Sequence, residues 1–184
     1  MKNFLETERL FIRMETAEEY KELFETCNDT ELKDILGMSA EALEVQKAKV
    51  KGGMTTYRTS FRMFHLIEKE SKQIIGDFAF HNWYAIHSRA EVGYAMKADE
   101  YKNKGYLKEA LKVIIPYGFD EMKLNRMEAI IGLDNIASQK AVAGIGFTYE
   151  ALLKEHYCDN GIIEDSMLFR LLRSEFEQHK TSAV

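Results

Sequence analysis

The spacing of apolar residues along the chain predicts a protein built from both strands and helices. Alternating or continuous apolar runs typical of strands occur at residues 4–13, 62–68, 74–83, 90–96, 126–133, 148–157 and 163–172. Apolar stripes with helical spacing begin near residues 17, 40, 107 and 137. The resulting order, β-α-α-β-β-β-α-β-α-β-β, is not a simple repeat of strand–helix–strand units. It predicts an α/β fold with a mixed sheet and helices on both of its faces.

Polar residues mark where the predicted helices begin. Thr16 and Glu19 have the spacing of a capping box, and Ser39 is expected to cap the helix that ends near residue 54. Pro116 lies inside the predicted helix at 107–122, where it lacks the backbone donor that a helix needs. We expect it to kink this helix or to end its regular part early.

A turn rich in lysine joins the predicted strand at 90–96 to the predicted helix at 107–122. It contains Gly105 and three lysines, Lys102, Lys104 and Lys108. The first amides of a helix have no partner within the helix, and the helix dipole places partial positive charge beside them. The turn is therefore a candidate site for a phosphate group. The alternative is an ordinary solvated surface, because lysines most often lie in water.

Length and composition indicate one folded domain over residues 1–184. The chain is 46% hydrophobic and 30% charged and has a single proline, so it offers material for one core and contains no linker-like segment. Only residues 178–184 are expected to be loose. The net charge of −5 argues against sequence-independent nucleic-acid binding. Mild acidity would suit a cationic amine, although it is also the ordinary state of many proteins.

Several other classes of protein are disfavoured by the residues that the chain uses. Cys27 and Cys158 have neither the spacing nor the histidine partners of a zinc site, so no metal is expected. No apolar run is long enough to cross a bilayer, and the first residues lack a signal-peptide pattern. The cytoplasm is the expected location. No Gly-Lys-Ser/Thr sequence follows the glycine of the turn, which argues against a P-loop nucleotide enzyme.

A series of short motifs follows in order along nearly the whole chain: residues 7–13, Ile75-Gly76, residues 91–94, residues 103–106, residues 135–138, Gly146-Phe147 and Asp165. Together these motifs resemble the Gcn5-related N-acetyltransferase superfamily, in its ribosomal-protein N-acetyltransferase-like branch. The resemblance implies an acyl-CoA N-acyltransferase fold, with a mostly antiparallel sheet whose central strand pair is splayed. It also implies acetyl-CoA as co-substrate and direct transfer of acetyl to an amine.

The resemblance assigns the cofactor to the strand before the turn and to the turn itself. The residues concerned are Tyr94, Ala95, Met96, Lys97, Lys102, Asn103, Lys104, Gly105, Tyr106, Leu107, Lys108, Asn135 and Ser138. Two features depart from the family pattern. Leu107 stands where glycine or alanine is usual, and the loop before Gly105 is one residue longer than usual. Asn135 could instead act only as a helix cap.

The catalytic residues implied by the resemblance are Glu91 as base and Ser138 or Tyr157 as acid. The position where many members carry an acidic tyrosine holds Val142 in this chain. Glu91 could alternatively be a solvated strand residue, and Ser138 could merely contact the cofactor.

Strand alternation predicts that His81 and Trp83 share one face. With Tyr84 they are candidates for an acceptor pocket, although such a histidine is more often simply packed.

Two classes of function therefore remain open from the sequence. The favoured one is an N-acetyltransferase, a monomer or homodimer, whose acceptor is a protein N-terminus or, as an alternative, a small amine such as a polyamine or an antibiotic. The other is a non-catalytic acyl-CoA-binding sensor, which the absent tyrosine and Leu107 keep open.

Overall fold

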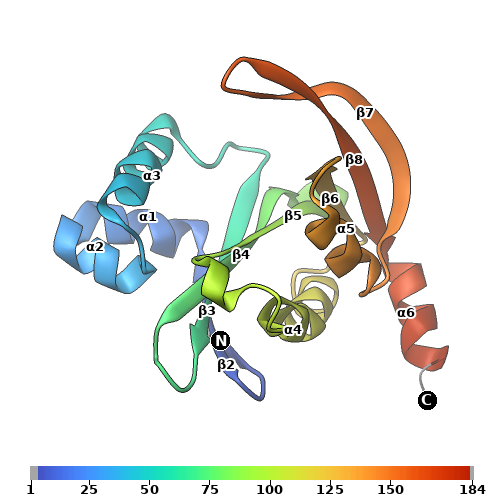
Figure 1. Cartoon of the computed structure of the whole chain (residues 1–184), viewed down its shortest axis with the longest axis horizontal. Helices are drawn as coiled ribbons and strands as arrows, with labels where there is room; N and C mark the ends of the chain where they lie inside the picture. The colour runs from blue at the N-terminus through green and yellow to red at the C-terminus, as the bar shows by residue number, and fades with distance from the viewer. Residues whose placement is uncertain (1–3, 183–184) are drawn as a thin grey trace.

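The computed structural model describes residues 4–182, which form one mixed sheet with helices on both faces (Figure 1). The elements, in chain order, are β1 (Phe4–Glu6), β2 (Leu10–Thr16), α1 (Ala17–Thr26), α2 (Asp29–Leu36), α3 (Ala40–Gly52), β3 (Ser60–Glu68), β4 (Ile74–Tyr84), η1 (Ala85–His87), β5 (Arg89–Met96), η2 (Asp99–Tyr101), α4 (Tyr106–Asp120), β6 (Arg126–Gly132), α5 (Ile136–Ala143), β7 (Thr148–Asp159), β8 (Ile162–Leu172) and α6 (Arg173–Ser182). The strand order in space is β1-β2-β3-β4-β5-β6-β8-β7. Neighbouring strands are antiparallel except for β5 and β6, which are parallel. The predicted fold class is confirmed.

The two faces of the sheet are covered by different helices. On one face, α4 buries its apolar stripe, including Ile114 and Phe119, against Phe64, Phe78 and Phe80 of β3 and β4. The phenylalanine rings of the strands meet edge to face at centroid separations of 5.0–5.8 Å, a favourable aromatic geometry. On the other face, α1, α2 and α3 form a second, smaller cluster with β3. Figure 1 shows these three helices well away from α4.

The strand β5 leaves its neighbour β6 part-way along its length. On one side, β5 pairs with β4 from Gly76↔Met96 to His81↔Glu91. On the other side, its pairing with β6 covers only Arg89, Ala90 and Glu91. Within residues 4–182, the backbone from Val92 to Met96 therefore has no strand partner on the β6 side. This is the splayed central pair that the resemblance implies.

The elements differ from the sequence predictions at several points. Residues 4–13 form two strands, because the chain turns at residues 7–9 and β1 pairs antiparallel with β2. The helix α2 was missed, although Asn28 and Glu31 form a capping box at its start. Residues 178–182, expected to be loose, continue α6, and residues 183–184 lie outside the described residues. In addition, α4 continues beyond Pro116 to Asp120, so the proline does not end that helix.

Candidate active site

The lysine-rich turn forms a cradle of backbone amides at the start of α4. Gly105 caps the helix with a φ of 81°, a left-handed conformation that glycine adopts without strain. The first amide bonded within the helix is that of Glu109, which donates to the carbonyl of Gly105 over 3.0 Å. The amides of residues 106–108 make no hydrogen bond to an acceptor within residues 4–182. They are free to bind an anion, as the sequence predicts.

A groove of about 660 Å³ runs from this turn along the free side of β5 to α5. It is lined by Tyr94, Ala95, Met96, Tyr101, Lys102, Asn103, Gly105, Tyr106, Leu107, Lys108, Asn135, Ala137, Ser138, Lys140 and Ala141. All the residues predicted to bind the cofactor lie here except Lys97 and Lys104. Sequence reasoning missed Tyr101, Ala137, Lys140 and Ala141. The last three share a helix with Ser138, so helical spacing could have indicated Ala141 one turn after Ala137.

Lys97 lies outside the groove because its side chain is held by a charge cluster. Its ammonium pairs with Asp77 at 2.5 Å, and Asp77 contacts the buried imidazole of His65 at 2.7 Å. Burial raises the pKa of Asp77, but the hydrogen bond and charge of His65 and the charge of Lys97 outweigh it and hold that pKa below its usual value. Lys104 is exposed, and its carbonyl accepts a hydrogen bond from Arg9 Nη1 at 3.0 Å.

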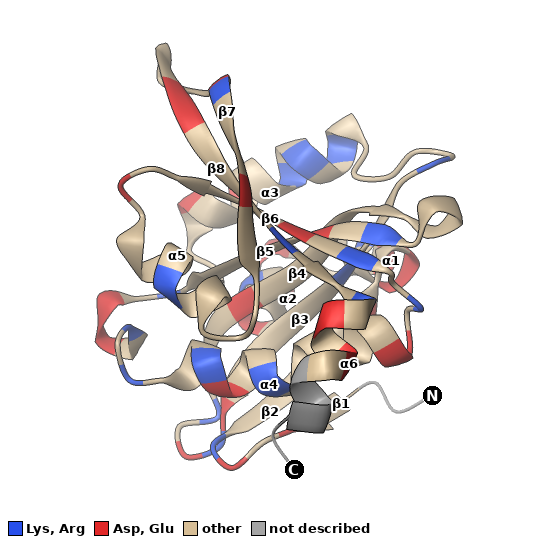
Figure 2. Cartoon of the chain, turned by 90° about the vertical axis from the view of Figure 1, so that its right-hand side faces the viewer, with Lys and Arg blue, Asp and Glu red and all other residues tan. Residues whose placement is uncertain are grey.

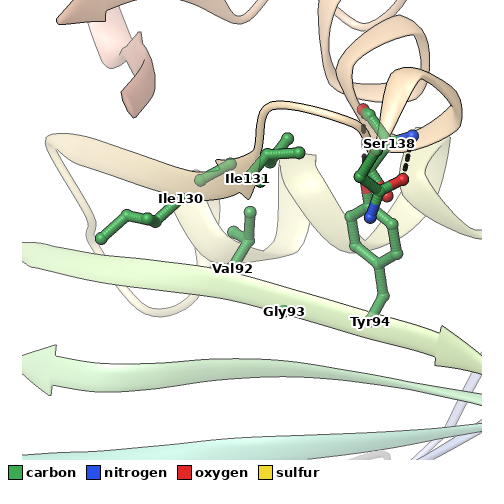
Figure 3. Close-up of a pocket in the computed structure, with 9 residues that line it drawn as sticks. Val92, Gly93, Tyr94, Ile130, Ile131 and Ser138 are labelled. Carbon is green, nitrogen blue, oxygen red and sulfur yellow. Dashed lines mark hydrogen bonds between the residues drawn. The ribbon is translucent and has the colours of Figure 1, made fainter. Parts of the chain in front are cut away.

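A smaller cavity of about 160 Å³ occupies the gap where β5 and β6 diverge (Figure 3). Tyr94, Asn135 and Ser138 line both this cavity and the groove, so they mark the junction between the two. The Tyr94 hydroxyl donates to the carbonyl of Ser138 over 3.3 Å and thereby links β5 to α5. Burial raises the pKa of Tyr94, and the contact with Ser138 only partly opposes this effect.

The side chain of Asn135 has a structural role at the start of α5. Its Oδ1 accepts a hydrogen bond from the amide of Ser138 at 3.1 Å and caps α5. This is the capping function that the sequence left open for Asn135, and it leaves the amide group of the side chain for other partners.

Glu91 and His81 lie side by side at the point where β5 and β6 part. Glu91 Oε2 accepts a hydrogen bond from Asn82 Nδ2 at 3.0 Å, and Glu91 Oε1 lies 3.7 Å from His81 Nε2. The imidazole covers Gly93, where a Cβ atom would lie only 2.8 Å from His81 Nε2. Strand alternation places these side chains on the face opposite Val92, which belongs to the core beneath α4.

The other residues predicted for an acceptor pocket do not join His81. Asn82 has a φ of 45°, and the register of β4 shifts between His81 and Tyr84. This bulge reverses the alternation, and Trp83 packs against the core that contains Phe80. The prediction that His81 and Trp83 share a face was therefore wrong. Tyr84 instead stacks under the guanidinium of Arg89, which lies 4.4 Å from its ring centroid.

Tyr157 lies on β7, opposite Glu164 and close to the end of the β7–β8 hairpin. Figure 2 shows this hairpin reaching beyond the other strands of the sheet. The tyrosine is 60% exposed and lines neither the groove nor the gap cavity. The structure thus brings Ser138, but not Tyr157, to the junction of the two cavities.

A series of ion pairs, which sequence reasoning missed, connects β5, β6 and β7 beside Glu91. Glu128 contacts Arg89 at 2.9 Å and Arg126 at 2.7 Å, and Arg126 continues to Glu150. Glu91 is in register with Glu128 across the last β5–β6 pair. Among the described residues no guanidinium lies within 4.0 Å of Glu91, so the two carboxylates have different surroundings.

Two kinds of feature are absent from residues 4–182. No helix in this part of the chain is long and apolar enough to cross a membrane. No group of three or more His, Cys, Asp or Glu side chains in residues 4–182 is arranged to hold a metal ion.

Comparison with known proteins identifies the family. The model of the acetyltransferase (GNAT) domain matches residues 9–148. The chain belongs to the GNAT acetyltransferase family. It is 27% identical to the uncharacterized N-acetyltransferase YoaA of Bacillus subtilis (strain 168). The 171 aligned residues cover 92% of this chain and 96% of YoaA. This GNAT chain is also 31% identical over 107 residues, 58% of each protein, to Bacillus subtilis YdaF, whose name marks it as a candidate ribosomal N-acetyltransferase.

The GNAT fold is found in solved structures too. An acetyltransferase of the GNAT family from Bacillus anthracis superposes with a TM-score of 0.66 and 26% sequence identity, covering 94% of this chain and 99% of that one. The predicted family and the predicted enzyme class are confirmed.

Proposed function

We propose that the groove beside β5 binds acetyl-CoA and that an amine acceptor approaches Glu91 from the opposite face of the sheet. The observation that carries this proposal is the break in β5–β6 pairing immediately after Glu91. It places the free strand edge, the gap cavity and an acidic side chain at one point. An acyl donor on one face could thus meet an amine on the other.

The residues of the groove fit the proposed cofactor. The free amides at 106–108 and the ammonium groups of Lys102, Lys108 and Lys140 suit phosphate groups. The unpaired backbone of Tyr94–Met96 suits the amide groups of a pantetheine arm, which could bond to it as a further strand would. Bound acetyl-CoA supplies an activated acetyl group, whose transfer from sulfur to nitrogen leaves a free thiol.

Glu91 and Ser138 receive different roles in this proposal. An ammonium group must lose a proton before its nitrogen can attack, and a Glu91 carboxylate oxygen accepts this proton directly or through water. Asn82 Nδ2 orients the carboxylate from one side. Ser138 lies at the junction of the groove and the gap cavity, which supports contact with the reactive end of the cofactor. Tyr157 has less support as an acid because it lies outside both cavities.

For the acceptor we propose a protein N-terminus. The support is the similarity to YdaF, which extends over 58% of each chain. An N-terminal amine is primary, flexible and narrow enough to reach a carboxylate at a strand junction. Small polyamines and aminoglycosides carry the same reactive group and are the alternative acceptors.

Two measurements on the purified protein test the proposed function. Acetyl-CoA should raise the melting temperature, because roughly a hundredfold excess over Kd adds about 2.7 kcal/mol of stability. Thiol release, with mass detection of product, should then be measured over N-terminal peptides, polyamines and aminoglycosides. We expect release with peptides. Absence of a thermal shift would refute the cofactor site, whereas a shift without release from any acceptor would favour the sensor.

A further inference from the structure

Three turns of the chain meet at the start of α4, and Arg9 lies between them. It belongs to the segment 7–9 that joins β1 to β2, and its carbonyl accepts the amide of Lys69 from the β3–β4 turn at 2.9 Å. Its guanidinium reaches the lysine-rich turn, where Nη1 donates to the carbonyl of Lys104 over 3.0 Å. The same group lies 4.3 Å from the ring centroid of Tyr106. Arg9 thus contacts the turn without itself lining the groove.

Arg9 also contacts a negative charge in the first turn of α4. Glu109 accepts hydrogen bonds from the Thr7 hydroxyl at 2.5 Å, from the Arg9 amide at 2.8 Å and from Arg9 Nε at 2.7 Å. Partial burial raises the pKa of Glu109, but these hydrogen bonds and the charge of Arg9 outweigh it and keep that pKa below its usual value. The carboxylate therefore remains ionised at neutral pH.

An ionised carboxylate at this position has two opposite effects. It stabilises the start of the helix by interacting with the helix dipole. It would also repel phosphate groups bound at the amides of residues 106–108, which lie in the same helical turn. The guanidinium of Arg9, held against the Glu109 carboxylate, offsets this repulsion and leaves the start of the helix intact.

We propose that Arg9 is a positioning residue for the cofactor phosphates, fixing the turn through Lys104 and Tyr106 and neutralising Glu109. The inference rests on the proposed cofactor site. It gives a function to the Thr7-Glu8-Arg9-Leu10 motif, which lies about one hundred residues before Glu109 in the sequence and does not itself line the groove. Specific cofactor binding then depends on two parts of the chain that fold together.

Calorimetric binding of coenzyme A to the full chain tests the proposal. Arg9→Ala should raise Kd about 10-fold or more, the effect of losing a charge-assisted contact. The matched control is Arg58→Ala, because Arg58 also lies over a tyrosine ring, at 5.0 Å from the centroid of Tyr57, but outside the groove. The control should bind like the parent. Unchanged binding by Arg9→Ala would overturn the proposal.

Two further comparisons separate a role in phosphate binding from a general structural role. S-acetylpantetheine has no pyrophosphate, so Arg9→Ala should use it with kcat/KM within about twofold of the parent value. An equal loss with acetyl-CoA and with S-acetylpantetheine would overturn the proposal. Adding Glu109→Gln to Arg9→Ala should make coenzyme A binding several-fold tighter than in Arg9→Ala, since it removes the exposed charge. No recovery in the double variant would overturn the neutralising role.

A folding defect can be recognised and bypassed. Arg9→Lys keeps a cation beside Glu109 but cannot donate to Glu109 and Lys104 with the same fork, so we expect a smaller loss of affinity than for Arg9→Ala. If Arg9→Ala melts well below the parent, Arg9→Lys replaces it in the same assays. Parent-like binding of coenzyme A by Arg9→Lys, with parent-like dependence on salt, would then refute the role of the two guanidinium hydrogen bonds to Glu109 and Lys104. A parent protein that binds no coenzyme A refutes the proposed cofactor site itself. Binding by the parent and equally by both Arg9 variants refutes only the role of Arg9.

Discussion

The two sides of β5 differ in their pairing, and the difference separates a side that belongs to the core from a side that borders the proposed ligand site. Towards β4, the pairing runs from Gly76↔Met96 to His81↔Glu91, and it ties β5 into the sheet. Towards β6, it ends at Glu91↔Glu128, and the rest of the strand borders a cavity and a groove. Because the β4 side fixes the position of the backbone, the β6 side can present free donors and acceptors without losing its shape. The proposed site thus depends on incomplete pairing of β5 with β6.

The last β5–β6 pair contains a second contrast. Glu91 and Glu128 are in register, but Glu128 is neutralised by Arg89 and Arg126, whereas Glu91 meets an amide and an imidazole. Both carboxylate oxygens of Glu128 are engaged, Oε2 by Arg89 and Oε1 by Arg126, so neither is available to an incoming amine. The carboxylate at the beginning of the gap is thus the better candidate for a base.

Replacing each glutamate by glutamine would test this contrast, with the largest effect that we predict. Glu91→Gln should lower kcat by about 10²–10⁴-fold, the usual contribution of acid–base catalysis, with little change in the Kd of acetyl-CoA. The acidic limb of its pH–rate profile should disappear. Glu128→Gln should retain most of the turnover, because Glu128 belongs to the ion pairs. Steady-state kinetics and calorimetry give both quantities, and equal losses of kcat in the two variants would contradict the assignment of a base.

A change at the end of the groove should affect the ligand side of β5 and leave the β4 side intact. Gly105→Val forces a β-branched residue into a left-handed conformation, which costs on the order of 1–3 kcal/mol. We expect acetyl-CoA binding to weaken by a comparable amount. Gly53→Val is the matched control, because Gly53 also has a positive φ, of 87°, in open space at the end of α3.

The control should lose stability without losing affinity. Melting temperature and calorimetric Kd, measured on both variants, separate the two quantities. Parent-like cofactor binding by Gly105→Val would show that the turn does not hold the phosphates.

Local sequence signals predicted much of the fold, and their failures have identifiable physical reasons. The capping box of Thr16 and Glu19 forms as predicted. The equivalent box of Asn28 and Glu31 was present in the sequence and was overlooked. The turn at residues 7–9 contains neither glycine nor proline and is stabilised by Glu109 from a distant helix. No local pattern can reveal such a contact.

The candidate site was predictable where it follows backbone geometry and less so where it depends on side-chain pairing. The lysine-rich turn followed from a strand–turn–helix junction, and the groove residues on β5 followed from the family resemblance. Trp83 was misplaced because a bulge at Asn82 overrides strict alternation, whereas the side chain of Lys97 lies outside the groove because it pairs with Asp77. The ion pairs of Glu128 depend on the β5–β6 register, which is a property of the folded sheet.

Replacing Ser138 by alanine is the change for which we predict the smallest effect on binding and turnover. It tests whether the hydroxyl at the gap cavity only contacts the cofactor or also takes part in the chemistry. The backbone of Ser138 is engaged by Tyr94 and Asn135, so an alanine at this position should fold normally. We expect Ser138→Ala to weaken acetyl-CoA binding by about 0.5–1.5 kcal/mol, the value of one ordinary hydrogen bond, with kcat retained. The physical reason is that a thiol with a pKa near 8.5 can leave without a strong acid.

The opposite result would assign a chemical role to the same hydroxyl. A fall in kcat of roughly 10²-fold with unchanged affinity would mean that Ser138 Oγ delivers a proton. Tyr157→Phe provides the comparison, because Tyr157 is exposed on the hairpin and lines neither cavity. We expect that variant to keep its turnover. A large loss in Tyr157→Phe would require the hairpin to approach the gap during catalysis, and the free side of β5 would then be closed by β7 when the acceptor reacts.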